Sequence, residues 1–240
     1  MSSDTPTLNL TNHFLIAMPG LNDDWFGKSV VFMCEHTPKG ALGLVINKPS
    51  DITLGDLFNK LELPLRRDDL ATMPVLRGGP LQLERGFVLH SAMGQATTVG
   101  RDDTPPAVAQ ALRDALDMSE SNPLAPADDE SSDDAPHSQP AAPLAYASTV
   151  RVGDHLEMTT SRDVLEAVSS GAGPSQVLVT LGYASWGEGQ LESEMGENSW
   201  LTVQADPALL FNTPIDQRYD KAMALLGLQP WMLAPGSGHA

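Results

Sequence analysis

An uninterrupted apolar run at residues 41–46, Ala-Leu-Gly-Leu-Val-Ile, limits the folds that are open to this chain. A strand that is apolar at every position is buried on both faces, so it belongs in the interior of a sheet. The run at residues 29–36 is β-branched and aromatic in its first half, and Pro38-Lys39-Gly40 supplies a turn between the two runs. The pattern therefore predicts a β-hairpin whose second strand is central and ends at Lys48-Pro49.

Strand and helix patterns occur in both halves of the chain. Short apolar or β-branched runs bounded by turn residues predict strands at residues 73–77, 86–91, 150–152, 155–160, 176–183 and 200–203. Apolar residues at helical spacing predict helices at 53–61, 161–168, 190–195 and 216–227, with Thr53 and Ser161 as N-caps of the first two. Neither half is long enough for a core of its own, so we expect one α+β domain whose sheet takes strands from both halves.

A break in composition separates the two halves. Residues 119–147 consist almost wholly of Asp, Glu, Ser, Pro and Ala and contain no Lys or Arg. Such a segment cannot bury enough apolar surface to offset the entropy of ordering it, which predicts a disordered acidic insertion. A regulatory or binding role for this run is the alternative to a plain solvated loop. Just before it, residues 105–117 predict a helix. The folded domain is expected over residues 10–228, between a disordered N-terminal tail at 1–9 and a flexible C-terminal tail at 229–240.

The charge and hydropathy of the chain limit its partners. The formal net charge is −17, whereas proteins that bind nucleic acids gain affinity from Lys and Arg at the phosphates, so direct nucleic-acid binding is not expected. No window reaches the roughly 18 consecutive apolar residues of a membrane span, and the N-terminus lacks the features of a signal peptide. We therefore expect no membrane association and a cytoplasmic location.

The residue inventory gives no support for a metal or cofactor site. Cys34 is the only cysteine, which excludes an internal disulfide and a cysteine-based zinc cluster. The six histidines are scattered, and no two have the i, i+4 spacing of a zinc protease motif. Gly187-Glu188-Gly189 precedes a predicted helix but lacks the further glycine and the Gly-Lys-Ser/Thr of a phosphate-binding loop. No metal and no cofactor are expected.

Two groups of residues could in principle supply a nucleophile or an acid–base pair. In a regular strand Cys34 and His36 share one face, which would allow an imidazole to activate the thiol. Val30 and Phe32 share that face as well, which favours a buried, inert Cys34 and a partly exposed His36 at the strand end. Glu192 and Glu194 do not share a helical face, so a hydrolytic carboxylate pair is not supported there. The sequence thus predicts no catalytic residue, and an enzyme using Cys34 or converged carboxylates is an alternative.

Polar and aromatic residues at predicted strand ends and turns form the most suggestive group. Side chains in such places are held by the sheet but reach solvent, and aromatic faces with amide groups suit binding of a small ligand or a peptide. The alternative is structural, with Asn and Gly in turns and the two Trp in the core. The predicted binding residues are Asn47, Lys48, Gly78, Gly79, Trp186, Gln190 and Asn198, with Pro80 and Trp200 beside them.

A series of segments resembles the ordered motifs of the bacterial YqgE/AlgH family. They include residues 14–19, 40–49, 78–80, 89–91, 181–192 and 198–200, and the resemblance extends from about residue 10 to 228. It implies an α+β domain with a curved, largely antiparallel or mixed sheet flanked by helices, and it brings the label of transcriptional regulator without established catalytic residues. The acidic stretch at 119–147 departs from the compact family pattern.

Three classes of function follow. The preferred one is a non-enzymatic regulatory protein that binds an unknown protein or small molecule and acts on transcription indirectly. The second is a DNA-binding transcriptional regulator, against which stand the charge and the lack of a basic helix-turn-helix pattern. The third is an unrecognised enzyme.

Overall fold

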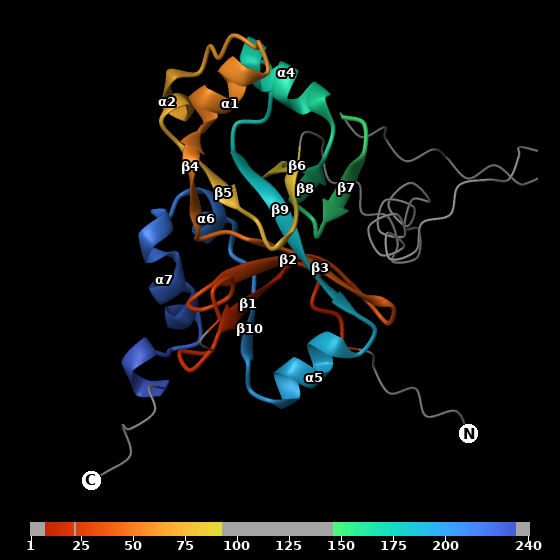
Figure 1. Ribbon diagram of the computed structural model, residues 1–240, viewed down its shortest axis with the longest axis vertical. Helices are drawn as coiled ribbons and strands as arrows, with labels where there is room; N and C mark the ends of the chain where they lie inside the picture. The colour runs from red at the N-terminus through yellow and green to blue at the C-terminus, as the bar shows by residue number, and fades with distance from the viewer. Residues whose placement is uncertain (1–7, 22, 93–145, 234–240) are drawn as a thin grey trace, which may run out of the picture.

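The computed structural model describes residues 8–21, 23–92 and 146–233 (Figure 1). Within them, ten strands form one sheet in the order β10-β1-β2-β3-β9-β6-β8-β7, and β5, which pairs with β4, joins beside β9. The strands are β1 (His13–Ala17), β2 (Val30–Thr37), β3 (Gly40–Val45), β4 (Pro49–Thr53), β5 (Pro74–Arg77), β6 (Leu81–Ser91), β7 (Thr149–Val152), β8 (Leu156–Thr159), β9 (Val177–Gly187) and β10 (Trp200–Gln204).

The helices of the described residues pack on this sheet. They are α1 (Leu54–Lys60), α2 (Asp68–Ala71), α4 (Arg162–Ser170), α5 (Gln190–Gly196), α6 (Pro207–Phe211) and α7 (Arg218–Leu225), with short 3-10 turns η1 (Ile215–Gln217) and η2 (Pro230–Leu233). The helices predicted at 53–61, 161–168, 190–195 and 216–227 are present as α1, α4, α5 and α7. The helix expected at 105–117 and nearly all of the acidic stretch at 119–147 lie outside the described residues.

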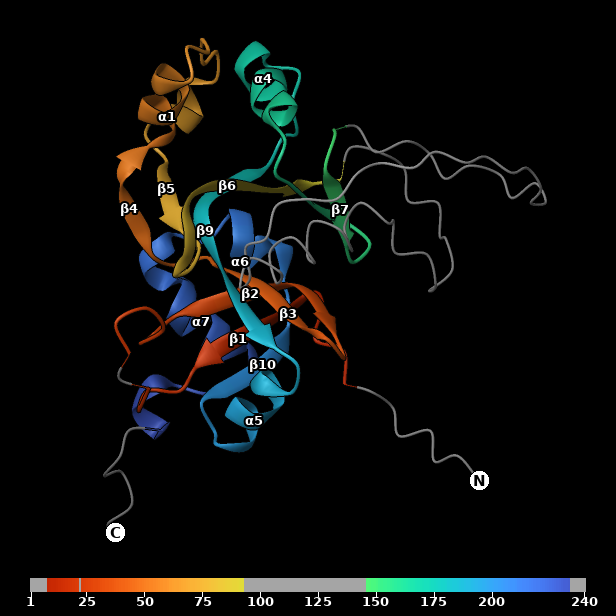
Figure 2. The same cartoon turned by 45° about the vertical axis from the view of Figure 1, so that its right-hand side comes forward.

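Strand β9 joins the two halves of the sheet. It pairs antiparallel with β6 over its first part and with β3 over residues 184–187, and it lies parallel to β5. Figures 1 and 2 show β9 crossing the centre of the molecule between an upper group of strands, which includes β5 and β6, and a lower group, which includes β1, β2 and β3. Apart from the parallel pairing of β5 with β9, all strand pairs among the described residues are antiparallel. The expected α+β domain with a curved, largely antiparallel sheet is confirmed.

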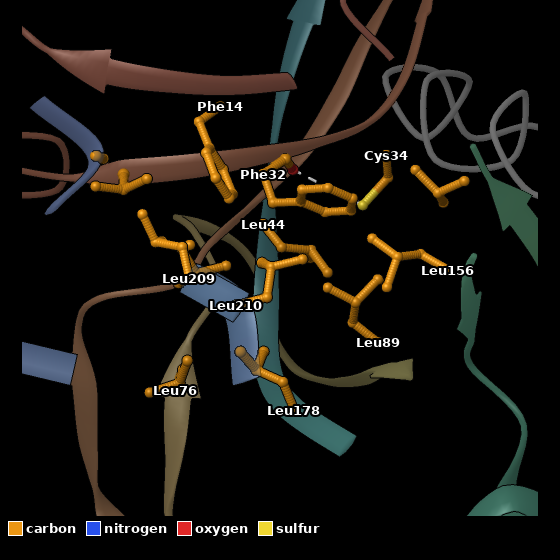
Figure 3. Close-up of a cluster of buried hydrophobic side chains, with 14 of the residues drawn as sticks. Phe14, Phe32, Cys34, Leu44, Leu76, Leu89, Leu156, Leu178, Leu209 and Leu210 are labelled. Atoms are coloured by element: carbon orange, nitrogen blue, oxygen red, sulfur yellow. Dashed lines mark hydrogen bonds between the residues drawn. The ribbon is translucent and has the colours of Figure 1, made fainter. Parts of the chain in front are cut away.

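The sheet buries side chains on both faces, as the apolar run at 41–46 predicts. Alternation along β1 sends Phe14 and Ile16 to one cluster and Leu15 and Ala17 to another. The first cluster fills the inside of the curl and is covered by α6 and α7; Figure 3 shows its side chains converging from strands of both halves. The second lies under α5, and a third packs α1, α2 and α4 on the upper strands.

Local sequence explains where the helices begin. Thr53 Oγ1 accepts the backbone N–H of Asp56, and the Asp56 carboxylate accepts the N–H of Thr53, a capping box that fixes the start of α1.

A buried arginine ties α7 to the sheet. Arg218, the first residue of α7, donates to the carbonyl oxygens of Thr213 and of Ile46, which directly follows β3. Burial lowers the pKa of Arg218 to about 10.

A β-bulge in β2 corrects one expectation. Met33 pairs with Gly43 and Glu35 with Leu42, so Cys34 is the extra residue on β2. Beyond the bulge the alternation is inverted: Cys34 lies in the inner cluster, whereas His36 pairs with Ala41, which belongs to the cluster under α5. The prediction that Cys34 and His36 share a face is therefore wrong. His36 is also buried, at 5% exposure, and not partly exposed.

Two further details differ from the sequence patterns. The sequence predicts that the second hairpin strand ends at Lys48-Pro49; β3 ends slightly earlier, at Val45, and Pro49 begins the next strand, β4. β4 pairs with β5 alone, an edge position that tolerates proline. Strand β1 and the short helices α2 and α6 had no predicted counterpart. None of the helices in the described ranges is both long and apolar enough to cross a membrane.

Candidate functional site

A carboxylate on α5 accepts hydrogen bonds from two indole groups. Oε2 of Glu194 accepts Nε1–H of Trp186 at 3.0 Å and Nε1–H of Trp200 at 2.8 Å. Oε1 of the same side chain accepts Nε2–H of Gln190 at 2.9 Å. Trp186 comes from the end of β9 and Trp200 from the start of β10, so Glu194 links two strands that the sheet order places far apart.

The turns around α5 bring these groups together. Gly189, with φ of +70°, is the N-cap of α5, and the Gln190 side chain accepts the backbone N–H of Gly187 at 3.1 Å, which closes the turn after β9. At the other end Asn198 is left-handed, with φ of +59°, and Ser199 N–H donates to the carbonyl of Glu194. The chain thereby reverses and enters β10 at Trp200. Asn198 has a turn role of the kind Asn tolerates well.

A cavity of about 380 Å³ opens beside the two tryptophans. The Phe26 ring lies 6.1 Å from Trp186 and 5.5 Å from Trp200, centroid to centroid, and the Trp rings lie 6.0 Å apart and nearly perpendicular. Such edge-to-face geometry is favourable for aromatic pairs. The lining residues come from the loop before β2, the turn before β6, and β9, α5 and β10: Leu21, Asp23, Phe26, Pro80, Leu81, Ser185, Trp186, Gln190, Glu194, Ser199 and Trp200.

Asp23 organises the loop that closes the cavity. Its Oδ1 accepts the backbone N–H groups of Trp25 at 2.8 Å and of Phe26 at 2.7 Å, which holds the Phe26 ring in place. Two carboxylates, Asp23 and Glu194, thus line the cavity, and its described lining includes no Lys, Arg or His. Lys48 lies close by but outside the lining. Burial and the neighbouring Arg77 lower the pKa of Lys48, while Asp23 and Asp24 act in the opposite direction.

The predicted binding residues fall into two groups. Trp186 and Gln190, with Pro80 and Trp200, line the cavity. The other five lie outside its lining. Asn47 accepts the N–H of Val30 and donates to the carbonyl of Lys28, so its amide secures a turn. Lys48 Nζ donates to the carbonyl of Asp24 at 3.4 Å.

Gly78 and Gly79, which follow β5, allow the backbone there to pack closely against the backbone of β9. A Cβ on Gly78 would lie 2.2 Å from the carbonyl oxygen of Gly182, and one on Gly79, where φ is +157°, would lie 2.2 Å from the carbonyl carbon of Tyr183. Only glycine permits so close an approach of two backbones. Gly182 itself has φ of +75° at the point where β9 passes from β6 to β3.

Glu194, Asp23 and Phe26 were not predicted as site residues. The sequence does not support Glu192 and Glu194 as a hydrolytic pair, and the structure gives each a separate partner. Glu194 accepts hydrogen bonds from the two indoles, and Glu192 Oε1 lies 2.9 Å from His36 Nε2. A usable signal was the i, i+4 spacing of Gln190 and Glu194, which places an amide and a carboxylate on the helix face next to two tryptophans.

Comparison with known proteins agrees with this architecture. The family model described as AlgH-like matches residues 14–124 and 133–231. The chain belongs to the AlgH-like family. The match leaves out residues 125–132, which lie within the acidic stretch predicted as an insertion.

Relatives of the AlgH-like protein align with it from end to end. UPF0301 proteins of Paracidovorax citrulli and of a Polaromonas species are 55% and 54% identical over 240 residues, covering 100% of each chain. The solution structure of the AlgH protein from Pseudomonas aeruginosa is 35% identical, with a TM-score of 0.63 and full coverage of both chains. A crystal structure of a Corynebacterium diphtheriae protein, 18% identical, shares the fold with a TM-score of 0.56 over 93% of this chain and 88% of that one.

In this AlgH-like chain Cys34 is an unfavourable nucleophile. The thiol is buried in the inner cluster and donates to the carbonyl of Phe32 at 3.8 Å (Figure 3). Burial, and to a lesser extent the charge of Glu35, raise the pKa of the Cys34 thiol far above its ordinary value. His36 lies on the other face, where its Nδ1 accepts the N–H of Leu10 at 3.1 Å. Among the described residues, no group of three or more His, Cys, Asp or Glu is placed to hold a metal ion.

Proposed function

We propose that this AlgH-like protein is a non-enzymatic binding protein that recognises a small molecule or a peptide in the cavity at Trp186, Trp200 and Glu194. The observation that carries the proposal is a cavity in which three aromatic side chains lie beside polar groups already fixed by hydrogen bonds. Ligand sites commonly combine an apolar wall with a few polar groups whose positions are set before binding. Side chains that are already fixed before binding lose little conformational entropy when the ligand enters.

A regulatory role is proposed to act through the bound partner. The net charge of −17 disfavours contact with the phosphate backbone of DNA, so an effect on transcription would pass through a protein or ligand held in the cavity. We propose a cytoplasmic location for this role, because the single cysteine, Cys34, suits a reducing compartment.

The test compares the wild-type protein with two matched variants captured gently from their own cells and weighed by native mass spectrometry. Leu81 lines the cavity and is 41% exposed, and Leu225 on α7 is 44% exposed and lies away from the cavity lining. Leu81→Arg should lose a stoichiometric companion that the wild-type protein and Leu225→Arg both retain. A companion kept equally by all three proteins would place recognition elsewhere. Recovery of DNA with the wild-type protein would favour direct regulation.

A further inference from the structure

We infer that the occupant of the cavity presents a cationic group, an ammonium or a guanidinium, on a short apolar stem; this inference rests on the binding function proposed above. Three features of the lining support this class of ligand over a neutral or an anionic one. They are the acceptors of Glu194 and Asp23, the aromatic walls, and the apolar rim at Leu81.

Glu194 retains capacity to accept a further hydrogen bond. An ionised carboxylate offers about four acceptor positions. Trp186, Trp200 and Gln190 occupy three of those on Glu194. A cationic donor would fit the fourth, and its charge would meet a carboxylate whose position two strands and a helix already fix. Charge-assisted hydrogen bonds of this kind are stronger than neutral ones.

Asp23, in the loop before β2, adds a second negative charge to the lining. Its Oδ1 accepts the loop N–H groups of Trp25 and Phe26. Lys48 is the basic side chain whose pKa responds to Asp23, and it donates to the carbonyl of Asp24 outside the lining. An anionic ligand would meet two carboxylates and no cationic side chain in the described lining, so the negative electrostatic potential of the cavity disfavours an anion.

The walls are suited to a cation as well. Indole and phenyl faces carry partial negative charge and attract ammonium and guanidinium groups that lie within about 6 Å of the ring. The molecule has an example near the cavity, where Arg77 Cζ lies 4.5 Å from the centroid of the Trp25 ring. In the lining, Leu81, 41% exposed, provides apolar contact for the stem of the ligand.

The inference is tested with probes that share one shape and differ in charge. The 15N-labelled full-length protein is titrated with n-butylamine, which is cationic at neutral pH, with n-butanol, and with butyrate, while the indole N–H signals of Trp186 and Trp200 are followed. Two blocked amino acids, Nα-acetyl-lysinamide and Nα-acetyl-norleucinamide, repeat the comparison for a peptide side chain. Both cationic probes should shift the two indole signals with affinities about tenfold or more above those of their uncharged counterparts.

Charge variants sharpen the result. Glu194→Gln and Asp23→Asn keep a hydrogen-bond acceptor but lose the charge, and each should weaken the cationic probes about threefold to tenfold without changing the weak affinity for n-butanol. Asp220→Asn on α7, which packs on the inner face of the sheet, is the matched control and should change nothing. At the exposed Leu81, a Glu substitution should tighten cation binding and a Lys substitution should weaken it.

The outcomes separate the inference from the proposed function. Tighter binding of the blocked lysine than of n-butylamine would indicate a peptide ligand, and the reverse a free amine; both support a cationic occupant. If n-butanol or butyrate binds as well as n-butylamine, the cationic class is wrong while a binding cavity remains. If no cationic probe shifts either indole signal, the inference is overturned, and the capture experiment with Leu81→Arg still decides the proposed function.

Discussion

The indole N–H groups of Trp186 and Trp200 donate to the same atom, Oε2 of Glu194. Both tryptophans are buried, at 2% and 5% exposure, so neither N–H has ready access to water as a substitute acceptor. The carboxylate therefore fixes both rings against β9 and β10 and shapes the wall of the cavity. The same three side chains therefore support the fold and line the proposed binding cavity.

Replacing Glu194 should separate its acceptor role from its charge. Glu194→Ala leaves two buried indole donors without a partner and should cost about 2–4 kcal/mol of unfolding free energy, whereas Glu194→Gln keeps an oxygen acceptor and should cost about 1 kcal/mol or less. Urea denaturation followed by circular dichroism measures both values. Equal losses in the two variants would show that the hydrogen bonds do not hold the indoles.

Gly79, which packs against the backbone of β9, should not tolerate a side chain. Gly79→Ala places a Cβ 2.2–2.4 Å from the backbone of Tyr183 and Ala184 at a φ of +157°, so it should cost more than about 2 kcal/mol or prevent folding. Gly86→Ala is the control, because a Cβ there meets no atom within 4 Å, and its effect should stay within about 1 kcal/mol. Thermal unfolding of both variants is the measurement. A stable Gly79→Ala protein would reopen a direct binding role for the Gly78–Gly79 turn.

His36 should be a neutral imidazole with its proton on Nε2. Its Nδ1 accepts the N–H of Leu10, so the proton must lie on Nε2, which donates to Glu192. Long-range 15N–1H correlation spectra identify the tautomer directly. His36→Ala should cost about 2–4 kcal/mol, because it leaves the N–H of Leu10 unpaired and opens a cavity.

Glu192 provides the matched comparison for His36. Its side chain is 46% exposed, so water can replace it at the imidazole, and Glu192→Ala should cost no more than about 1 kcal/mol. A proton on Nδ1, or equal losses for the two variants, would contradict the assigned hydrogen bonds.

Burial of Cys34 should make the protein less stable at alkaline pH. The thiol has a raised pKa in the folded chain, so its contribution is fully present below the ordinary thiol pKa of about 9 and is lost as pH rises above that value. Between pH 9 and 10.5 wild-type stability should fall relative to Cys34→Ala by up to about 1.4 kcal/mol per pH unit. Denaturation of both proteins across this range measures the difference, in which the tyrosine contributions largely cancel.

Thiol labelling checks the same burial in an independent way. A thiol reagent should modify native Cys34 much more slowly than the denatured chain, because access requires an opening of the inner cluster. Labelling of native protein as fast as that of denatured protein, together with parallel stability curves for the two proteins, would revive Cys34 as a reactive group.

The sequence was informative wherever a local pattern decides the structure. The apolar run at 41–46 predicts a buried strand, and β3 is buried along its whole length. Thr53 predicts the start of α1 because capping depends on residues three apart. In contrast, no alternation pattern shows that Cys34 is a bulge residue, and the one-residue shift sends His36 to the other face.

The candidate site was only partly predictable for the same reason. Trp186 and Gln190 stand out by residue type, but the role of Glu194 depends on the meeting of β9, α5 and β10, which the sequence does not display. Gly78 and Gly79 are predicted from the sequence as binding residues at a turn, whereas in the structure they pack against the backbone of β9, about 100 residues further along the chain.

The central claim is that recognition takes place at Trp186 and Trp200, and the indole N–H signals of the 15N-labelled protein test it most directly. The companion captured from the protein's own cells is added back to the purified chain. Binding in the cavity predicts shifts of the Trp186 and Trp200 signals and a smaller change, or none, at Trp25, which lies against Arg77 outside the lining. A companion that binds while both cavity signals stay unchanged would contradict the claim.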